Sequence, residues 1–215
     1  MSEARFDPAL VESEPEAAAA IFGDRIDLAR TFTNQLVLCG DELGLIGPRE
    51  LPQLWTRHIL NSALSAPLVS GRVVDVGSGA GLPGLVLAIV RPDAEFTLVE
   101  PMERRTVWLQ SQVDLLALSN VYVVRSRAED FDVVEPFDFA TARAVSALRT
   151  LIPLTAPLVR SGGELVLLKG ARASEEIEKA AKAIRKYRLT DVRVEELGAA
   201  EGVEITRVVR ATVDP

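Results

Sequence analysis

The most constraining feature of the sequence is a short apolar run that passes directly into a glycine-rich turn. Residues 73–84 read Val-Val-Asp-Val-Gly-Ser-Gly-Ala-Gly-Leu-Pro-Gly, and a helix-like apolar pattern follows. Glycines between a strand and a helix let the backbone bend sharply and approach a ligand closely. Pro83 suits the first turn of a helix, where its missing N–H is no loss. The segment therefore predicts an α/β fold with a ligand site at the end of its first strand.

Downstream of residue 71 the apolar pattern alternates between strand-like and helix-like segments. Strands are expected near 72–76, 95–99, 121–125, 137–142, 163–168, 191–197 and 204–213, and helices near 83–90, 103–117, 147–159 and 175–187. Continuous apolar strands such as 73–76 and 96–99 indicate a sheet covered on both faces. The pattern predicts a Rossmann-like, doubly wound α/β sheet. Such a sheet resembles that of class I methyltransferases, a likeness of fold that does not by itself establish function. Its strands are mostly parallel, with an antiparallel C-terminal strand, and helices precede it.

The region before the first strand is expected to be helical. The apolar spacing from Ile26 to Leu36 predicts one helix, with Asp24 as a possible N-cap and Gly40 as a possible C-cap. A second helix is expected from Pro52 to Ala66. Two or three helices therefore precede the sheet.

Acidic residues concentrate near the N-terminus. Residues 1–16 hold five acids and are expected to form a mobile arm or a loose first turn. Residues 1–56 carry ten acids and four bases, whereas 57–215 carry twenty-one acids and twenty bases, within a net charge of −7. This balance permits an RNA substrate without indicating one. We expect one compact unit, with an N-terminal arm and helices at 1–70 packing on a core at 71–215.

Composition argues against membrane insertion, secretion and a cysteine metal cluster. The longest central apolar run, Leu85–Val90, is far shorter than the roughly 20 residues that span a bilayer. Residues 1–5 lack the order of a signal peptide. Cys39 is the single cysteine. We therefore expect a cytoplasmic monomer without a metal site and without membrane association.

The glycine turn also matches a dinucleotide-binding fingerprint. Residues 79–84 fit G-x-G-x-x-G, and Glu100 follows Gly79 by 21 residues, where an NAD ribose would be bound. The match begins two residues after the strand ends, however. Asp75 lies on that strand, and its carboxylate suits a cationic ligand with an amino acid moiety better than a pyrophosphate. Methyl transfer from S-adenosylmethionine is therefore favoured over nicotinamide chemistry.

Polar residues follow the next three strands at the same edge of the predicted sheet. Glu100 can accept the two hydroxyl protons of a nucleoside ribose. Ala128 can offer a backbone N–H to an adenine, and either Glu129 or Asp130 an acceptor. Arg143 ends the fourth strand among small residues and can hold a phosphate, a carboxylate or a base. A surface acid and a loop-bracing salt bridge are the alternatives for Glu100 and Arg143.

Five stretches occur in a specific order: 57–62 (Arg-His-Ile-Leu-Asn-Ser), 74–84, 126–129 (Ser-Arg-Ala-Glu), 142–144 (Ala-Arg-Ala) and 168–170 (Leu-Lys-Gly). Together they resemble the glucose-inhibited division protein B family, bacterial methyltransferases that modify guanine N7 in 16S ribosomal RNA. The resemblance covers about residues 22–213. The loop at 44–50 resembles the actinobacterial branch of that family.

The resemblance implies a set of site residues. The cofactor contacts, taken with the glycine turn, are Gly77, Ser78, Gly79, Gly81, Leu82, Glu100, Ala128, Glu129 and Arg143. The candidates for the guanosine or its phosphates are Arg57, His58, Asn61 and Lys169. Guanine N7 carries a lone pair and no proton, so we name no general base, and Arg143 is expected to position the reactants. The RNA is expected as part of the small ribosomal subunit.

Three alternatives stay open at this point. The same sheet suits a small-molecule methyltransferase, for which RNA would be dispensable. An NAD-dependent oxidoreductase remains possible through the dinucleotide fingerprint. A nucleotide-sensing module would bind the cofactor without turnover.

Overall fold

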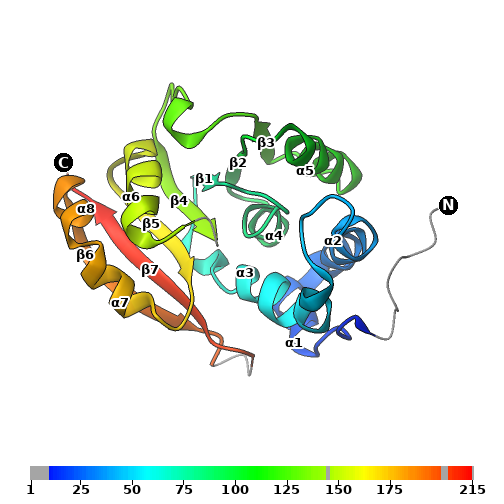
Figure 1. Cartoon of the computed structure of the whole chain (residues 1–215). Helices are drawn as coiled ribbons and strands as arrows, with labels where there is room; N and C mark the ends of the chain where they lie inside the picture. The colour runs from blue at the N-terminus through cyan, green and yellow to red at the C-terminus, as the bar shows by residue number, and fades with distance from the viewer. Residues whose placement is uncertain (1–9, 144–145, 200–202, 215) are drawn as a thin grey trace.

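The computed structural model describes residues 10–143, 146–199 and 203–214, which build a seven-stranded sheet in the order β3-β2-β1-β4-β5-β7-β6 (Figure 1). Its strands are β1 (Arg72–Val76), β2 (Glu95–Val99), β3 (Val121–Val124), β4 (Phe137–Arg143), β5 (Val159–Lys169), β6 (Leu189–Leu197) and β7 (Thr206–Val213). All seven expected strands are present. Strand β5 begins earlier than residue 163, because it continues the pairing of β4 back to Val159.

The strand order creates a topological switch point beside β1. This strand pairs in parallel with β2 on one side and β4 on the other. Strand β7 pairs antiparallel with both β5 and β6, which confirms the antiparallel C-terminal strand. Ligands of open α/β sheets bind where the strand order reverses, outside the carboxyl ends. The glycine turn after β1 and Arg143 at the end of β4 both lie at this place.

Helices cover the two faces of the sheet with separate hydrophobic clusters (Figure 1). One face carries α4 (Gly84–Val90), α5 (Glu103–Leu115) and the N-terminal helices α1 (Ala17–Phe22), α2 (Ile26–Cys39) and α3 (Asn61–Ala63). The other carries α6 (Leu148–Thr155), α7 (Ala173–Lys179) and α8 (Ala181–Lys186). The N-terminal helices share one continuous cluster with β1, β2 and α4. The division of the chain at residue 70 stays a prediction.

The helix expected from Pro52 to Ala66 is wrong as a single α-helix. The chain forms a 3-10 helix at Pro48–Gln53, a π-helix at Leu54–Leu60, the short α3, and a 3-10 helix at Ala66–Leu68. Pro52 and Pro67 lie in the two flanking 3-10 helices. Between them the Asn61 N–H bonds the Thr56 carbonyl, five residues back, which gives the interior of the expected helix a π-helical turn. π-helical turns are rare and are frequent at functional sites.

The first expected helix begins and ends differently from the sequence pattern. Asp24 lies in a 3-10 turn, and α2 begins at Ile26 without a side-chain cap. Gly40 follows α2 with φ −61°, so the left-handed conformation does not explain the glycine. A Cβ there would lie 2.3 Å from the carbonyl oxygen of Leu36, and close packing is the reason for the glycine.

The acidic N-terminal segment is anchored where it is described. Residues 1–9 of the predicted arm lie outside the described residues. The Glu12 carboxylate accepts the backbone N–H of Thr56 at 2.9 Å, and Arg30 Nε donates to Glu14 at 2.7 Å. A helix also begins at Ala17, which the sequence pattern missed. Residues 12–16 are therefore not a loose arm.

The C-terminal helical segments are shorter than expected. The expected helix 147–159 ends at Thr155 and continues as a 3-10 turn at Ala156–Leu158, since Pro157 has no N–H for a further α-turn. The expected helix 175–187 is divided into α7 and α8 at Ala180, whose N–H contacts both the Glu176 and the Ile177 carbonyl oxygens.

Among the described residues, no helix has the length and apolar character that crossing a bilayer requires.

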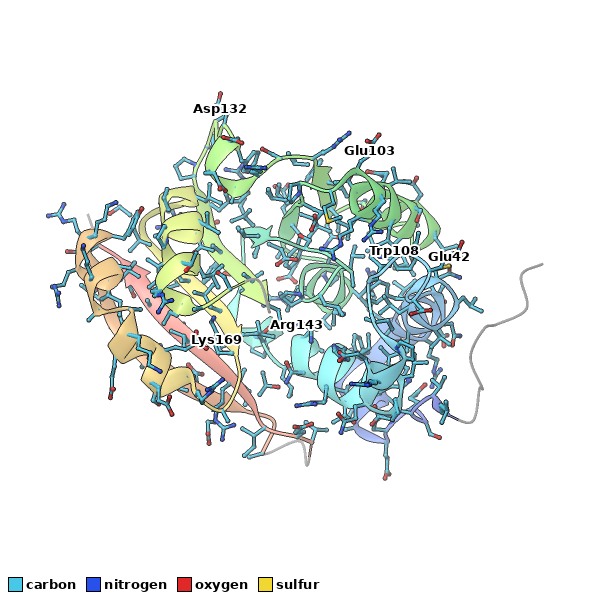
Figure 2. All side chains as sticks on the ribbon, in the orientation of Figure 1. Glu42, Glu103, Trp108, Asp132, Arg143 and Lys169 are labelled. Carbon is cyan, nitrogen blue, oxygen red and sulfur yellow. The ribbon has the colours of Figure 1, made fainter. Side chains whose placement is uncertain are left out.

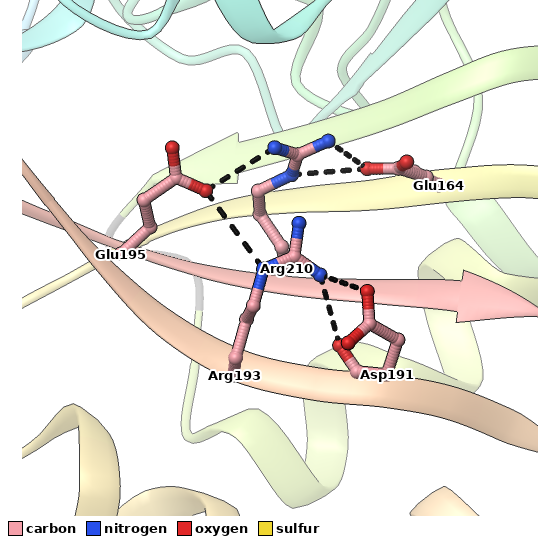
Figure 3. A network of polar contacts seen from close by, with 5 residues as sticks. All are labelled: Glu164, Asp191, Arg193, Glu195 and Arg210. Atoms are coloured by element: carbon pink, nitrogen blue, oxygen red, sulfur yellow. Dashed lines mark hydrogen bonds and ion pairs between the residues drawn. The ribbon is translucent and has the colours of Figure 1, made fainter.

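Beyond β4, one face of the sheet carries charged side chains instead of helices. Arg210 on β7 forms ion pairs with Glu164 on β5 and with Glu195 on β6, and Arg193 extends the network to Asp191 (Figure 3). These side chains point away from α7 and α8 (Figure 3). The ion pairs therefore occupy β5, β6 and β7, away from the switch point between β1 and β4 in the strand order.

Candidate functional site

A cavity of about 570 Å³ opens at the carboxyl edge of β1, β2, β3 and β4. Eight of the nine residues proposed to contact a cofactor line it, namely Gly77, Ser78, Gly79, Leu82, Glu100, Ala128, Glu129 and Arg143. Gly81 does not line the cavity. The fold therefore brings together residues that four separate strand ends contribute.

The glycine turn is held against the end of β2 by backbone hydrogen bonds. Gly77 N–H donates to the Val99 carbonyl at 2.8 Å, and the Ser78 hydroxyl donates to the Asp75 carbonyl at 2.9 Å. Gly77 and Gly79 both have φ in the left-handed region, at 71° and 55°. The turn thus presents its main chain to the cavity, in a conformation that favours glycine.

Gly81 has a structural reason of its own. Its φ is 96°, and a Cβ at this position would lie 2.4 Å from Leu85 Cδ1. Its N–H donates to the Ser78 carbonyl at 2.7 Å. The residue closes the turn onto α4 and does not face the cavity.

Asp75 lies beneath the turn and does not face the cavity. Its side chain is completely buried, and Oδ2 accepts the Gly84 N–H at 3.1 Å. Burial raises the pKa of this carboxyl to about 7. A Cβ on Gly84 would lie 2.6 Å from Asp75 Oδ2, so the glycine is needed for this contact. Asp75 braces the turn and does not line the cavity, so the structure gives no support to the expected contact with an amino acid moiety.

Glu100 is fixed by the backbone on both sides of its carboxylate. Oε2 accepts the Gly79 N–H at 3.0 Å, and Oε1 accepts the Met102 N–H at 3.0 Å. Its side chain is almost fully buried, and Arg105 Nη1 lies 4.0 Å from Oε2. Each carboxylate oxygen can accept further hydrogen bonds, so an oriented pair of acceptors lines the cavity.

A second cavity of about 610 Å³ lies beside the first, between the N-terminal helices and the ends of β4 and β5. All four proposed RNA contacts line it, namely Arg57, His58, Asn61 and Lys169. Arg143 lines both cavities. Figure 2 shows Arg143 and Lys169 near the middle of the molecule. The guanidinium of Arg143 therefore lies in the wall that the two cavities share.

Arg143 is held by the π-helical segment of the N-terminal region. Its Nη1 lies 2.9 Å from His58 Nδ1 and donates to the Arg57 carbonyl at 3.2 Å. Burial lowers the pKa of the guanidinium to about 10. The Arg143 Nε–H and Asp75 Oδ1 are both buried without a hydrogen-bond partner among the described residues.

His58 is buried and connects Arg143 to Glu50. Its Nε2 lies 2.6 Å from Glu50 Oε2, and the residue is 9% exposed. Burial, followed by the positive charge of Arg143, lowers the pKa of the imidazole to about 4 despite the opposing effect of Glu50. The ring is therefore neutral at pH 7, and both of its nitrogens are engaged.

Lys169 is engaged within the protein. Its Nζ donates to the Ser146 carbonyl at 2.6 Å and forms an ion pair with Glu176 at 3.0 Å. Glu176 also accepts the Leu148 N–H at 2.7 Å, so the pair contacts both Ser146 and the first residue of α6. The Lys169 side chain is 8% exposed. These contacts show that Lys169 braces this wall of the second cavity.

Sequence reasoning missed several lining residues. Arg105 lines the first cavity from the first turns of α5, and its Nε is buried without a partner in the described part of the chain. Arg49 and Glu50 line the second cavity from the 3-10 helix Pro48–Gln53. The sequence signal for Arg49 and Glu50 was the charged pair in the loop at 44–50, shortly before Arg57 and His58.

Solved structures share this fold at low sequence identity. An S-adenosylmethionine-dependent O-methyltransferase from Thermotoga maritima matches with a TM-score of 0.55 and 18% identity, over 73% of this chain and 65% of that one. The N-methyltransferase NodS from Bradyrhizobium japonicum, crystallised with S-adenosyl-L-homocysteine, matches with a TM-score of 0.52 and 18% identity, over 74% of this chain and 86% of that one. The sheet is thus a class I methyltransferase sheet.

Sequence comparisons identify the family. The family model GidB, described as rRNA small subunit methyltransferase G, matches residues 25–205. "Ribosomal RNA small subunit methyltransferase G" of Clavibacter michiganensis is 60% identical over 96% of this chain and 99% of the relative. The protein of the same name from Leifsonia xyli is 62% identical over 94% of this chain and 98% of the relative. These matches favour methyl transfer over nicotinamide chemistry, and the chain belongs to the rRNA small subunit methyltransferase G family.

Proposed function

We propose that this protein transfers the methyl group of S-adenosylmethionine to N7 of a guanine in 16S ribosomal RNA. The observation that carries the proposal is the position of Arg143 in the wall between two adjacent cavities. A cofactor in the first cavity and a base in the second would meet at this residue. Family membership supports ribosomal RNA as the substrate class.

The first cavity suits an adenosine with an amino acid moiety. The Glu100 carboxylate is oriented by two backbone N–H groups, and its free acceptor positions match a pair of ribose hydroxyl groups. The turn at 77–79 exposes main chain beside it. Ala128 and Glu129, after β3, offer main-chain and carboxylate groups for a base edge. These residues, with Ser78, Leu82 and Arg143, are the proposed cofactor contacts, and Gly81 supports them from behind the turn.

The chemistry requires positioning more than proton transfer. S-adenosylmethionine, when bound, supplies an electrophilic methyl group on a sulfonium. Guanine N7 has an in-plane lone pair and no proton to lose, so an in-line displacement needs no general base. Both nitrogens of His58 are engaged, by Arg143 and by Glu50, which leaves the imidazole unsuited to accept a proton. Orientation of the reactants in such a site is worth up to several kcal/mol.

The charge of the second cavity fits a nucleotide that becomes more positive during reaction. Four cationic side chains, those of Arg49, Arg57, Arg143 and Lys169, face two carboxylates, those of Glu50 and Glu176. The cations suit phosphates, and the Glu50 carboxylate suits the positive charge that N7 methylation places on the base.

The net charge of −7 leaves this protein little general attraction for naked RNA. We therefore propose that the assembled small subunit is the substrate, and that the protein acts on it as a monomer.

The proposal is tested by supplying unmodified small subunits and S-adenosylmethionine labelled in its methyl group. Label on a single guanine of 16S RNA, mapped by mass spectrometry of nuclease digests, is the expected result. Protein-free 16S RNA serves as the comparison, and we expect it to accept label more slowly. Label found only on protein or on small molecules would overturn the proposal, and turnover without any RNA would indicate a small-molecule methyltransferase.

A further inference from the structure

A chain of polar contacts connects the rim of the second cavity to the wall between the cavities. Glu50 Oε2 lies 2.6 Å from His58 Nε2, and His58 Nδ1 lies 2.9 Å from Arg143 Nη1. The three side chains come from three different elements, the 3-10 helix Pro48–Gln53, the π-helix Leu54–Leu60 and β4. All three line the second cavity.

The chemistry of the two ends fixes the protonation of the middle residue. A guanidinium can only donate, so His58 Nδ1 must accept the hydrogen bond from Arg143. A carboxylate can only accept, so His58 Nε2 must carry the proton that it donates to Glu50. The arrangement therefore selects the neutral Nε2–H tautomer of the imidazole.

The local backbone explains why these residues can meet. In the π-helical segment the Asn61 N–H bonds the Thr56 carbonyl, five residues back, which widens the turn that carries Arg57 and His58. The Arg57 carbonyl then accepts from the same Arg143 Nη1, at 3.2 Å. Arg143 thus has two acceptors on one segment, and the hydrogen bond from His58 to Glu50 helps to hold that segment in place.

We propose that Glu50 is a positioning residue that acts through His58. It holds the imidazole as the Nε2–H tautomer, so that Nδ1 fixes the guanidinium of Arg143 at the boundary of the two cavities. The proposal rests on the proposed function, because the fixed guanidinium is there to orient the base against the methyl donor. In this proposal Glu50 orients the imidazole, and His58 connects Glu50 to Arg143 through hydrogen bonds and does not transfer a proton.

The readout is direct because His58 is the only histidine in the chain. In nitrogen-15 NMR of this protein, the imidazole signals come from His58 alone, so they need no residue assignment. They report the tautomer of the ring and the pH at which it becomes protonated. We expect a protonated Nε2, an unprotonated Nδ1 and a neutral ring at pH values well below the ordinary histidine pKa of about 6.5. The charged groups that face the ring are Glu50, Arg57 and Arg143.

Substitutions then separate positioning from folding. Glu50→Ala is expected to weaken the preference for the Nε2–H tautomer, which Arg143 alone still favours. It should lower kcat on small subunits by about 10- to 100-fold, the scale of a slight misplacement of reacting groups. KM for S-adenosylmethionine should change less than kcat, because Glu50 does not line the first cavity and reaches it only through Arg143. Glu50→Gln keeps an acceptor of the same size, and a smaller loss of kcat is expected.

A double-mutant cycle tests whether Glu50 acts through His58. His58→Asn places an amide oxygen near the position of Nδ1 and keeps an acceptor for Arg143, so we expect it to retain more activity than His58→Ala. In the His58→Asn background, Glu50→Ala should cost no further activity. Glu135→Gln is the matched control, since this exposed glutamate pairs with Arg72 at the opposite end of the sheet.

Four results would overturn the inference. They are an Nδ1–H tautomer in the unchanged protein, ordinary titration near pH 6.5, wild-type kcat in Glu50→Ala, and an undiminished cost of Glu50→Ala in the His58→Asn background. If the unchanged protein transfers no methyl group to small subunits, the proposed function is wrong. The imidazole spectra of the Glu50 variants would still decide whether this carboxylate sets the tautomer.

Discussion

The two adjacent cavities are similar in volume, at about 570 and 610 Å³, and are built in different ways. The first is built around the glycine turn after β1 and the ends of β2 and β3. The second is lined by many charged side chains, which come from residues 49–61, from the end of β4 at Arg143, from 168–170 and from Glu176. The wall of the first cavity at this turn depends on a few glycines and on the buried Asp75, which supports the turn through the Gly84 N–H. Side-chain walls depend on hydrogen bonds and ion pairs between side chains of different elements.

This difference predicts how the two cavities respond to substitution. In the first cavity, one carboxylate supplies the fixed polar group, so its loss should remove most of the binding. In the second cavity, several side chains hold one another in place, so single losses should be smaller and should depend on one another.

Glu100→Ala is expected to have the largest effect. It removes two charge-assisted hydrogen bonds to the ribose, worth roughly 1.5–3 kcal/mol each, so the Kd for S-adenosylhomocysteine should rise by two to four orders of magnitude. Isothermal titration calorimetry measures this change. Glu103→Gln, which removes an exposed carboxylate that pairs with Arg125, should leave Kd unchanged. An unchanged Kd in Glu100→Ala would mean that this carboxylate does not contact the cofactor.

Asp75→Asn tests what lies beneath the main-chain turn. Because burial raises the folded-state pKa of Asp75 to about 7, the folded protein keeps a proton that the unfolded chain loses above about pH 4. The stability of the unchanged protein relative to Asp75→Asn should therefore fall between about pH 4 and pH 7, by at most roughly 1.4 kcal/mol per pH unit. Urea unfolding across this range measures it, and a constant difference would contradict the raised pKa.

The first cavity could be predicted from the sequence because its parts are local. The glycine turn is contiguous, and Glu100 and Ala128 directly follow recognisable strands, so parallel topology alone brings them to one edge. Gly81 and Asp75 are the exceptions. Both lie in the motif and neither lines the cavity, since the motif must also hold α4 against the strand.

The second cavity could be predicted only in part. Arg57, His58, Asn61 and Lys169 came from the family resemblance, and the sequence carried no signal that Glu50 contacts His58. That contact depends on a π-helical segment, which hydrophobic periodicity cannot distinguish from an α-helix over seven residues. The meeting of His58 with Arg143, 85 residues later, depends on how the N-terminal helices pack on the sheet.

Lys169→Met tests whether ion pairs hold the second cavity together. The substitution removes the contacts to Ser146 and Glu176, so we expect a loss of roughly 1–2 kcal/mol in the free energy of unfolding. In the Glu176→Gln background the same substitution should cost less, because the ion pair is already absent. Equal costs in both backgrounds would show that the pair contributes nothing. Chemical denaturation at pH 7 provides the measurement.

Arg57→Gln is expected to have the smallest effect and separates a phosphate contact from a structural one. The Arg57 side chain is exposed, and only its carbonyl contacts Arg143, so the substitution should leave the melting temperature and the cofactor Kd unchanged. Affinity for small subunits should fall by a few fold, and the slope of log K against log salt should decrease by roughly 0.7–0.9, the loss of one phosphate contact. Arg185→Gln, on exposed α8 at the opposite face, should leave that slope unchanged. If both substitutions lower the slope equally, the protein's general charge attracts the RNA, and the second cavity has no special part in holding a phosphate.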